Sequence, residues 1–521
     1  AMTYSNQGRW TEAEILNVEV LKQQKRILGM EHPDTIRAAG NLAATYSKQG
    51  RWTEAEKLEV EVLEQQRQIL GMEHPHTILA AANLAATYSD QGRWTEAEKL
   101  NVEVLEQRKR ILGMEHPDTI RAAANLAVTY SKQGRWTKAE KLNVEVLEQR
   151  KRILGMEHPD AIRAAANLAA TYRDQGRWTE AEKLEVEVLE QRERILGMEH
   201  PGTILAAANL AATYSDQGRW TEAEKLEVEV LEQRKRILGM EHPDTIRAAG
   251  NLAATYSKQG RWTEAEKLEV EVLEQRKRVL GMEHPETIFA AANLARTYSN
   301  QGRWNEAESL EVEVLEQRKR LLGMEHPDTI LATANLARTY RDQGRWTEAE
   351  SLEVEVLEQR KRILGVEHPH TIRAAANLAA TYSGQGRWTE AEKLEVEVLE
   401  QRERILGMEH PGTILAAANL AVTYCTQEGR WNEAEKLKVE VLEQRRRILG
   451  MEHPATIVAA ANLARTYSDQ GRWTEAEKLK VEVLEQQQRI LGMEHPDTIL
   501  AAANLARTYG DQGRWVEAER L

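Results

Sequence analysis

Residues 34–75 read DTIRAAGNLAATYSKQGRWTEAEKLEVEVLEQQRQILGMEHP, and closely similar blocks fill the rest of the chain. The 13 tryptophans mark the period, because they lie 42 residues apart from Trp10 to Trp515, except for one step of 43 between Trp388 and Trp431. A period of this length is typical of repeat proteins, in which each unit buries its apolar face only against its neighbours. This stretch therefore predicts an elongated array.

Composition narrows the class of protein. Apolar residues make up 41% of the sequence and charged residues 29%, and no run of 18 apolar residues could span a bilayer. The formal charge is 70 − 83 = −13, which opposes binding to nucleic acid. The single cysteine, Cys425, cannot form an internal disulfide, which favours a cytoplasmic location. We expect residues 1–521 to form one continuous array with partial repeats at both ends, and no contact with membranes.

Each unit is expected to contain two antiparallel helices. Pro33, with His32 before it, marks the start of the first helix, helix A, which ends near Gly50. Thr53 and Glu56 have the spacing of a capping box, so the second helix, helix B, is expected to begin at Thr53. Two helices in every 42 residues predict an all-α fold, an α-solenoid of about twelve repeats.

Helix B is amphipathic, with residues at three- and four-residue spacing expected in the core: Ala55, Leu58, Val62, Ile69 and Leu70. Its acidic residues are expected to face outward: Glu54, Glu56, Glu59, Glu61 and Glu64. The basic end of helix B, as at residues 108–110, suits the helix dipole, and Glu106 is placed to pair with Arg110. Gly71 is expected to cap the end of the helix.

Residues 41–46 (NLAATY) and 49–56 (QGRWTEAE) resemble the tetratricopeptide repeat (TPR) family. In that family, helix A carries a leucine, a small residue and a tyrosine, and a glycine turn leads to an alanine of helix B. The 42-residue period is most similar to the kinesin-light-chain type. The chain departs from the family pattern at Glu59, where many members carry a large aromatic residue. The resemblance implies a right-handed solenoid of TPR-like repeats that binds proteins.

Differences between the repeats concentrate on one stripe of helix A. The positions equivalent to residues 34, 37, 41, 44 and 48 are three or four residues apart, so they share one face. In TPR arrays helix A lines the concave groove, so the resemblance implies that this stripe contacts the ligand. The variable ligand-binding candidates are Arg37, Arg121, Arg163, Arg247, Phe289, Arg296, Arg338, Arg373, Arg465 and Arg507.

The centre of the stripe is an asparagine in every repeat. An amide offers donors and acceptors, so a row of asparagines could hold the backbone of an extended peptide. The alternative is that each asparagine ties one helix pair to the next. These further candidates are Asn41, Asn83, Asn125, Asn167, Asn209, Asn251, Asn293, Asn335, Asn377, Asn419, Asn462 and Asn504.

The arginines of the stripe bear on the kind of partner. Guanidinium groups pair with carboxylates and phosphates in bidentate fashion, which favours an acidic peptide. The alternative is that these arginines are solvated and are balanced by neighbouring aspartates. Because the array is acidic as a whole, we expect a protein or peptide partner and no nucleic acid.

No constellation of residues indicates catalysis. Each repeat carries Glu-His-Pro, as at residues 31–33, but one histidine per loop is no metal site, and capping or loop packing is the simpler interpretation. The sequence has no glycine-rich phosphate loop, serine elbow or paired catalytic carboxylates. We therefore expect a protein that is not an enzyme and that holds no cofactor and no metal.

Three functions are kept as hypotheses. The first is a protein-interaction scaffold that binds an extended peptide in the concave helix A groove. The second is a structural element that assembles head to tail through apolar faces at Tyr4 and Leu521. The third comes from the resemblance, since similar tandem repeats form the ligand-sensing regions of larger NOD-like (STAND) receptor ATPases.

Overall fold

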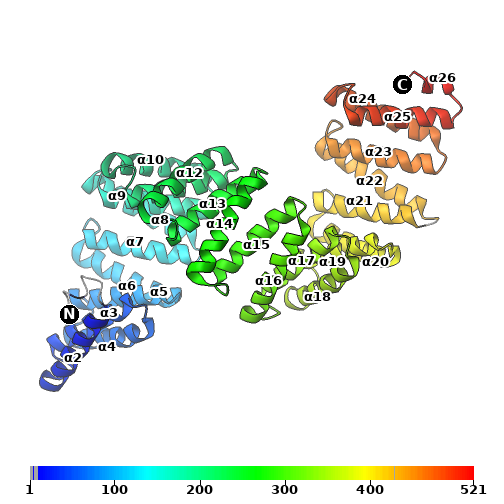
Figure 1. Cartoon of the computed structure of the whole chain (residues 1–521). Coiled ribbons are helices and arrows are strands. Elements are labelled where there is room, and N and C mark those ends of the chain that lie inside the picture. Colours follow the sequence, from blue (N-terminus) through cyan, green and yellow to red (C-terminus); the bar gives the residue numbers. More distant parts are fainter. Residues whose placement is uncertain (1–3, 5–9, 428, 521) are drawn as a thin grey trace. The chain divides into compact units, whose positions relative to one another are not determined.

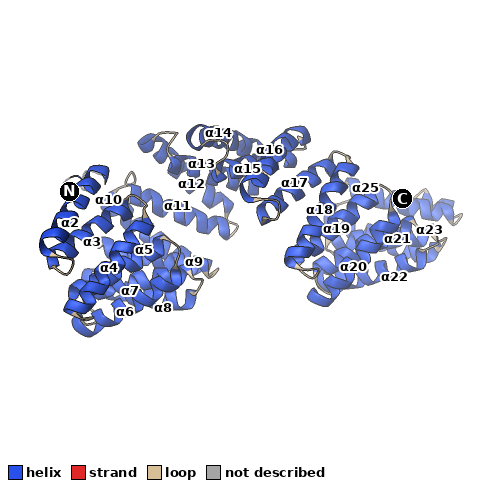
Figure 2. Cartoon of the chain, turned by 90° about the horizontal axis from the view of Figure 1, so that it is seen from below, coloured by secondary structure: helices blue, strands red, loops and turns tan. Residues whose placement is uncertain are grey.

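The computed structural model describes Tyr4 and residues 10–427 and 429–520. Within these ranges all the secondary structure is α-helical, in 25 helices (Figure 2). The predicted all-α fold is confirmed. The ends of the two partial repeats, residues 1–3 and Leu521, lie outside the described residues.

Helices of two lengths alternate along the chain. The 16-residue helices correspond to helix A: α3 (Pro33–Lys48), α5 (Pro75–Asp90), α7 (Pro117–Lys132), α9 (Pro159–Asp174), α11 (Pro201–Asp216), α13 (Pro243–Lys258), α15 (Pro285–Asn300), α17 (Pro327–Asp342), α19 (Pro369–Gly384), α21 (Pro411–Thr426), α23 (Pro454–Asp469) and α25 (Pro496–Asp511). The 19-residue helices correspond to helix B: α2 (Trp10–Leu28), α4 (Trp52–Leu70), α6 (Trp94–Leu112), α8 (Trp136–Leu154), α10 (Trp178–Leu196), α12 (Trp220–Leu238), α14 (Trp262–Leu280), α16 (Trp304–Leu322), α18 (Trp346–Leu364), α20 (Trp388–Leu406), α22 (Trp431–Leu449) and α24 (Trp473–Leu491). A four-residue helix, α26 (Trp515–Ala518), follows.

The chain divides into two compact units, which are residues 1–268 (unit 1) and 269–521 (unit 2). Within each unit, a helix packs mainly against the helix before it and the helix after it in the chain (Figure 1). Such nearest-neighbour packing is the pattern expected for a solenoid. That the two units form one continuous array stays a prediction.

The start of helix A follows the prediction. Pro33 is the first helical residue, and the Nδ1 atom of His32 accepts a hydrogen bond from the backbone N–H of Asp34 at 3.2 Å. The same histidine cap occurs in every helix A of the array. The recurring histidine is therefore a capping residue.

The turn between helices A and B is also determined by residues that lie close together in the sequence. Gly50 has φ = 75°, a conformation that side chains disfavour, and the Arg51 N–H then bonds the Tyr46 carbonyl at 2.9 Å. The Arg51 guanidinium lies 4.3 Å from the centre of the Tyr46 ring. At the other end of helix B, Gly71 has φ = 82° and is the cap residue that the sequence predicts.

The predicted capping box is wrong. Helix α4 begins at Trp52, one residue earlier than expected, and the cap residue Arg51 makes no side-chain capping bond. Glu56 cannot close the box because its carboxylate is used elsewhere, accepting hydrogen bonds from Gln91 and Arg93 of the next repeat. A capping box is recognised from the spacing of two residues alone. Here the glutamate instead bonds residues of the next repeat, which the spacing does not show.

The core consists of small and branched residues. Ala55 and its equivalents are fully buried where helices A and B cross, as is shown by Ala223 and Ala391. In unit 2, leucines, isoleucines and valines such as Leu378 and Val398 join one apolar cluster. The alanine at each crossing keeps the two helices close, so this position excludes larger side chains.

Three predictions about helix B are wrong. Ile69 and Leu70, which were expected in the core, are 46% and 41% exposed. Glu59, which was expected to face outward, is only 7% exposed. The predicted Glu106–Arg110 pair is also absent, since Arg110 instead bonds Gln107 and pairs with Glu73 of the preceding loop.

Candidate binding surface

The variable stripe of helix A is exposed to solvent. Leu79 of α5, Phe289 of α15 and Leu415 of α21 are 48%, 55% and 52% exposed, although they are large apolar residues. The arginines at the equivalent positions are exposed as well. Exposed apolar residues occupy this position on seven of the twelve helices A, so the stripe offers apolar as well as polar contacts to a partner.

The arginines at the position of Arg37 are not free. In unit 1, Arg37 pairs with Asp34 at 2.6 Å and Arg121 with Asp118 at 2.5 Å, each within the first turn of its own helix. Arg163 and Arg247 pair with Asp160 and Asp244 in the same way. In unit 2, Arg373 lies 3.0 Å from the His370 ring. The four arginines of unit 1 are thus paired with carboxylates of their own helices, whereas the charge of Arg373 is not compensated by His370.

The arginines at the position of Ala44 differ. Their side chains are exposed, and within the described residues none forms an ion pair or hydrogen bond. All of them lie in unit 2, on α15, α17, α23 and α25: Arg296, Arg338, Arg465 and Arg507. Unit 2 therefore presents the arginines that are available to an acidic partner.

The twelve asparagines of the stripe are exposed or half-exposed. In the described parts of the chain their side-chain amides form no hydrogen bond. Only their backbone carbonyls are used, as where Thr45 donates to the Asn41 carbonyl at 2.9 Å. The amides are therefore available to a ligand, and the ties between repeats come from other residues.

Two hollows open on the stripe at equivalent places, one in each unit. The first has a volume of about 310 Å³ and is formed by α9, α10 and α11, with Asn167 and Asn209 in its lining. The second, of about 400 Å³, is formed by α23, α24 and α25, with Asn462 and Asn504 in its lining. Both hollows bring together stripe residues of two consecutive helices A.

The two hollows differ in charge. In the first, Glu185 lies at the position that Lys480 occupies in the second. Both hollows have two arginines in their lining, Arg163 and Arg192 in the first and Arg465 and Arg507 in the second, but only the second also has aspartates, such as Asp511. Because the backbone is the same, this difference arises from side chains alone.

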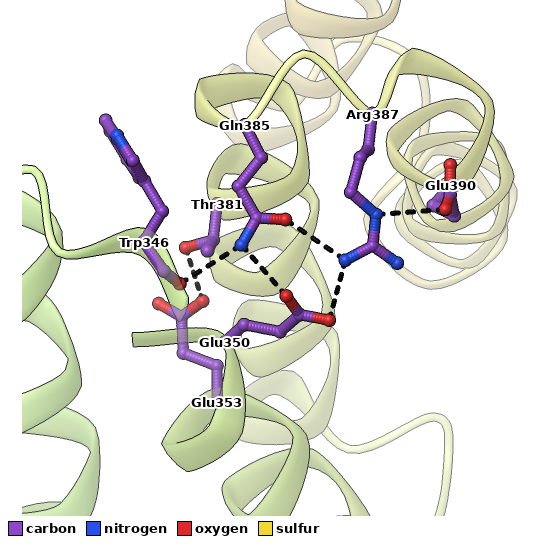
Figure 3. Close-up of polar contacts among 7 residues, drawn as sticks. All are labelled: Trp346, Glu350, Glu353, Thr381, Gln385, Arg387 and Glu390. Carbon is purple, nitrogen blue, oxygen red and sulfur yellow. Dashed lines mark hydrogen bonds and ion pairs between the residues drawn. The ribbon is translucent and has the colours of Figure 1, made fainter. Parts of the chain in front are cut away.

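A recurring polar cluster ties consecutive repeats together (Figure 3). Arg387, next to α20, donates to Glu350 of α18 at 2.8 Å, and Gln385 donates to the other oxygen of Glu350 at 2.8 Å. Gln385 also donates to the Trp346 carbonyl at 3.2 Å, and Arg387 pairs with Glu390 at 3.0 Å. The equivalent arginine–glutamate pairs elsewhere have distances of 2.5 to 2.8 Å.

The hydrogen bonds of this cluster change the acidity of its glutamates. The bond from Gln385 and the bond and charge of Arg387 lower the pKa of Glu350, although burial opposes this. The same causes lower the pKa of Glu14 in unit 1. These carboxylates thus stay ionised and fix the position of each helix A relative to the preceding helix B.

A second contact between repeats is buried and was missed by sequence reasoning. It uses the helix B position of Glu59, which is asparagine, glutamate or lysine in different repeats and faces a threonine of the next helix A. Asn101 donates to Thr129 at 3.1 Å, Lys438 donates to Thr466 at 2.6 Å, and Glu353 accepts from Thr381 at 2.5 Å. The sequence did carry one indication of this contact, because the position holds only polar residues, each of which can form a hydrogen bond with a hydroxyl.

Two features bear on other classes of function. Among the described residues, no group of three or more histidine, cysteine, aspartate and glutamate side chains is arranged to hold a metal ion. No helix in the described ranges is both long and apolar enough to cross a membrane.

The repeat geometry and the recurring contacts define a helical repeat scaffold. The family model of the tetratricopeptide repeat matches overlapping segments along the chain: residues 1–68, 76–152, 121–194, 160–236, 203–278, 244–320, 288–362, 328–404, 371–436, 413–480 and 459–521. The chain belongs to the tetratricopeptide repeat family. This family consists of scaffolds, which is consistent with a role in protein–protein interaction.

Solved structures with similar repeats include kinesin-light-chain-like proteins. The nearly identical TPR-like repeats of a putative kinesin light chain of Podospora anserina share 30% identity, cover 40% of this chain and 99% of their own, and give a TM-score of 0.38. The BtubC (BKLC) protein of P. vanneervenii shares 20% identity over 45% of this chain and 93% of its own, with a TM-score of 0.39. No curated protein sequence matches.

Proposed function

We propose that the stripe of helix A forms a groove that binds an extended protein segment, without catalysis, and that unit 2 selects an acidic segment. The observation that carries this proposal is the set of four exposed arginines in unit 2 that have no partner within the described residues. An exposed guanidinium pairs well with a carboxylate, and several along one surface give additive, salt-sensitive attraction.

The asparagines have a different role in this proposal. Their free amides would bond the backbone of the bound segment and so hold it extended, whatever its sequence. Apolar residues such as Phe289 and Leu415 would then contact its side chains. This division separates general affinity, which comes from the asparagines, from selectivity, which comes from the variable positions.

The first test is a screen of peptide arrays with the purified chain, using acidic, basic and apolar extended peptides at two salt concentrations. We expect capture of acidic peptides that weakens at high salt. The double variant Arg338→Ala with Arg465→Ala should weaken this capture at least about tenfold, because two charge-assisted pairs are lost. The matched control is Arg121→Ala with Arg247→Ala, whose arginines already pair with Asp118 and Asp244.

The role of the asparagines has its own test. Replacement of Asn167, Asn209 and Asn251 by alanine should weaken binding of every captured peptide class while the helical circular dichroism is unchanged. Unchanged affinity in a folded variant would refute the backbone-holding role. Failure of all peptide classes to bind would refute the groove proposal itself.

A second candidate function is head-to-tail self-association. It is favoured by apolar side chains on the first and last helices, where Ile15 and Ile27 of α2 are 64% and 69% exposed and Trp515 of α26 is 67% exposed. Mass measured by sedimentation at rising protein concentration tests it, and a strict monomer at high concentration would exclude it. The alternative of a receptor sensor region would use the same stripe, so the peptide screen also covers it.

A further inference from the structure

The buried position of helix B described above shows two hydrogen-bonding patterns. Where the residue is asparagine, it donates to the facing threonine, and that threonine donates to a backbone carbonyl of its own helix. Asn101 donates to Thr129 at 3.1 Å, and Thr129 donates to the Asn125 carbonyl at 3.1 Å. Lys480 makes the same arrangement with Thr508, which donates to the Asn504 carbonyl.

At Glu353 the pattern reverses. Thr381 donates to Glu353 at 2.5 Å, so its hydroxyl proton is used on the carboxylate rather than on the backbone. An ionised carboxylate can only accept, whereas a protonated one carries an O–H that donates as the asparagine amide does. Protonation of the glutamate would therefore allow the pattern that the chain itself builds with asparagine and lysine.

The glutamates fall into two groups according to the residue twelve positions earlier, on helix A of their own repeat. Glu185 and Glu353 have an arginine there, at 3.7 Å for Arg173 and 3.3 Å for Arg341. Five have serines instead, namely Ser47, Ser215, Ser257, Ser299 and Ser383, and four of these five are considered further: Glu59, Glu227, Glu311 and Glu395. In these four, one carboxylate oxygen is buried and has no hydrogen-bond partner in the described residues. A buried, half-satisfied carboxylate is costly when it is ionised and much less so when it is neutral.

The other charged groups around these four glutamates do little to offset the negative charge of an ionised carboxylate. Glu59 faces Asp90 of α5 as well as Glu56 of its own helix, and Glu395 faces Glu392 of its own helix. Glu227 faces Lys258 of α13, whose Nζ bonds Ser215 of α11 at 2.8 Å, and Glu224 of its own helix.

Around Glu311 the charges are mixed. Arg338 and Asp342 of α17 oppose each other, and Glu308 lies on its own helix. None of the four glutamates thus has an ion pair with a cation within the described residues.

We propose that Glu59, Glu227, Glu311 and Glu395 are proton-operated clamps, which tighten the packing of consecutive repeats when the solution becomes mildly acidic. Each clamp is a carboxyl–threonine pair between a helix B and the next helix A. Its threonine belongs to the helix that carries the binding stripe, so the clamp acts directly behind the candidate binding surface. The proposal does not depend on what that surface binds.

The pKa values of these glutamates are shifted in the direction that the clamp proposal requires. Burial raises the pKa of Glu59 to about 6 and those of Glu227 and Glu311 to about 7, from an ordinary value of 4.5, although the facing threonine opposes the rise. A carboxyl whose pKa is higher in the folded state binds its proton more tightly there. The stabilisation is complete below about pH 4.5 and is lost as the pH rises through about 6 to 7.

The experiment compares urea unfolding of the full chain at pH 5.5 and pH 8.0. We expect the wild type to resist urea better at pH 5.5, with the unfolding equilibrium constant lowered about fourfold through Glu59 and by more than about tenfold each through Glu227 and Glu311. The combined variant Glu59→Gln, Glu227→Gln, Glu311→Gln and Glu395→Gln should be stabilised at pH 8.0 and should lose more than about half of this pH dependence. A wild type that is equally stable at both pH values, or a combined variant that keeps the full dependence, would overturn the proposal.

Two further variants keep the test decisive if the combined variant does not fold. Asn101→Glu should introduce additional pH dependence of the same sign, because its helix A neighbour is also a serine, Ser89. Glu185→Gln should reduce the pH dependence less than a clamp variant does, because Arg173 lies 3.7 Å from Glu185 and opposes the rise of its pKa. Isotope-edited infrared spectroscopy of the glutamates gives a direct readout, and absence of a protonated carboxyl band at pH 5.5 would contradict the clamp.

Discussion

Arg387 and Glu350 join two consecutive repeats, with 2.8 Å between the guanidinium Nη1 and the carboxylate Oε1 (Figure 3). The Glu350 carboxylate therefore bonds residues of the following repeat, although Glu350 itself lies on helix B of the preceding repeat. Because Gln385 bonds the other carboxylate oxygen, both oxygens of Glu350 accept a hydrogen bond from the following repeat. This contact turns a row of helix pairs into a connected scaffold.

Replacement of Glu350 by glutamine should destabilise unit 2 at pH 7 by about 1 kcal/mol, since Arg387 is partly solvated. The cost should shrink at pH 3.5. The pKa of Glu350 is lowered in the folded state, so its contribution is fully present above about pH 4.5 and is lost as the pH falls through the folded-state pKa. Urea unfolding of both proteins at the two pH values checks this, and an equal cost at both would contradict it.

This sign is opposite to that of the buried clamps. Acidification from pH 8 to about 5 increases the stability that Glu227 and its equivalents contribute to the fold. Further acidification decreases the stability that Glu350 and its equivalents contribute. The array should therefore be most stable near pH 5. A stability maximum above pH 7 would mean that one of the two classes of glutamate has been assigned the wrong protonation state.

Ala223→Leu should destabilise unit 1 by about 1 to 3 kcal/mol, because Ala223 is fully buried where α12 crosses α11. The matched control is Ala86→Leu, at an exposed position on the stripe of α5, which should change stability by less than about 0.5 kcal/mol. Thermal unfolding followed by circular dichroism compares the two. Equal effects would show that the crossing tolerates larger side chains.

His200→Ala should cost about 1 kcal/mol, because the backbone N–H of Gly202 loses its acceptor, the histidine Nδ1 atom at 3.0 Å. His200→Asn should recover most of this loss, since an asparagine side chain caps a helix equally well. Hydrogen exchange of the first turn of α11 reports the effect locally. Protection unchanged in His200→Ala would argue against a capping role.

The features that the sequence predicted well are those with local causes. The helix A starts at Pro33 and its equivalents, the glycine turns and the alternation of helices follow from residues within a few positions of each other. The family was also evident, because residues 41–46 and 49–56 recur with few changes along the chain. The stripe of helix A is likewise exposed as expected, although its binding role stays a proposal.

The failures concern residues whose partners lie in the next repeat. Glu56 has the spacing of a capping box but binds Arg93, and Glu59 lies among polar positions of helix B but is buried against Thr87. Helical periodicity assigns a residue to one side of its helix without showing how far the neighbouring helix pair extends. Ile69 and Leu70 are also exposed, although the periodicity places them in the core.

The basic triplet at the end of helix B shows the same limit and gives a final prediction. The helix dipole accounts for a positive charge there, but Arg234 and Arg236 have different surroundings. Arg234 is 7% exposed and donates to the Asp244 carbonyl at 2.8 Å, and burial lowers its pKa. Arg236 is exposed and pairs with Glu199 at 2.5 Å.

Arg234→Met should therefore cost about 1 to 3 kcal/mol, because it leaves the Asp244 carbonyl without its buried donor. Arg236→Met should cost less than about 1 kcal/mol, as is usual for exposed ion pairs. Both variants lose one charge from the same turn, so a pure dipole effect would destabilise them equally. Urea unfolding in low and high salt separates the cases: salt should reduce the cost of Arg236→Met and leave that of Arg234→Met, and equal, salt-sensitive costs would favour the dipole.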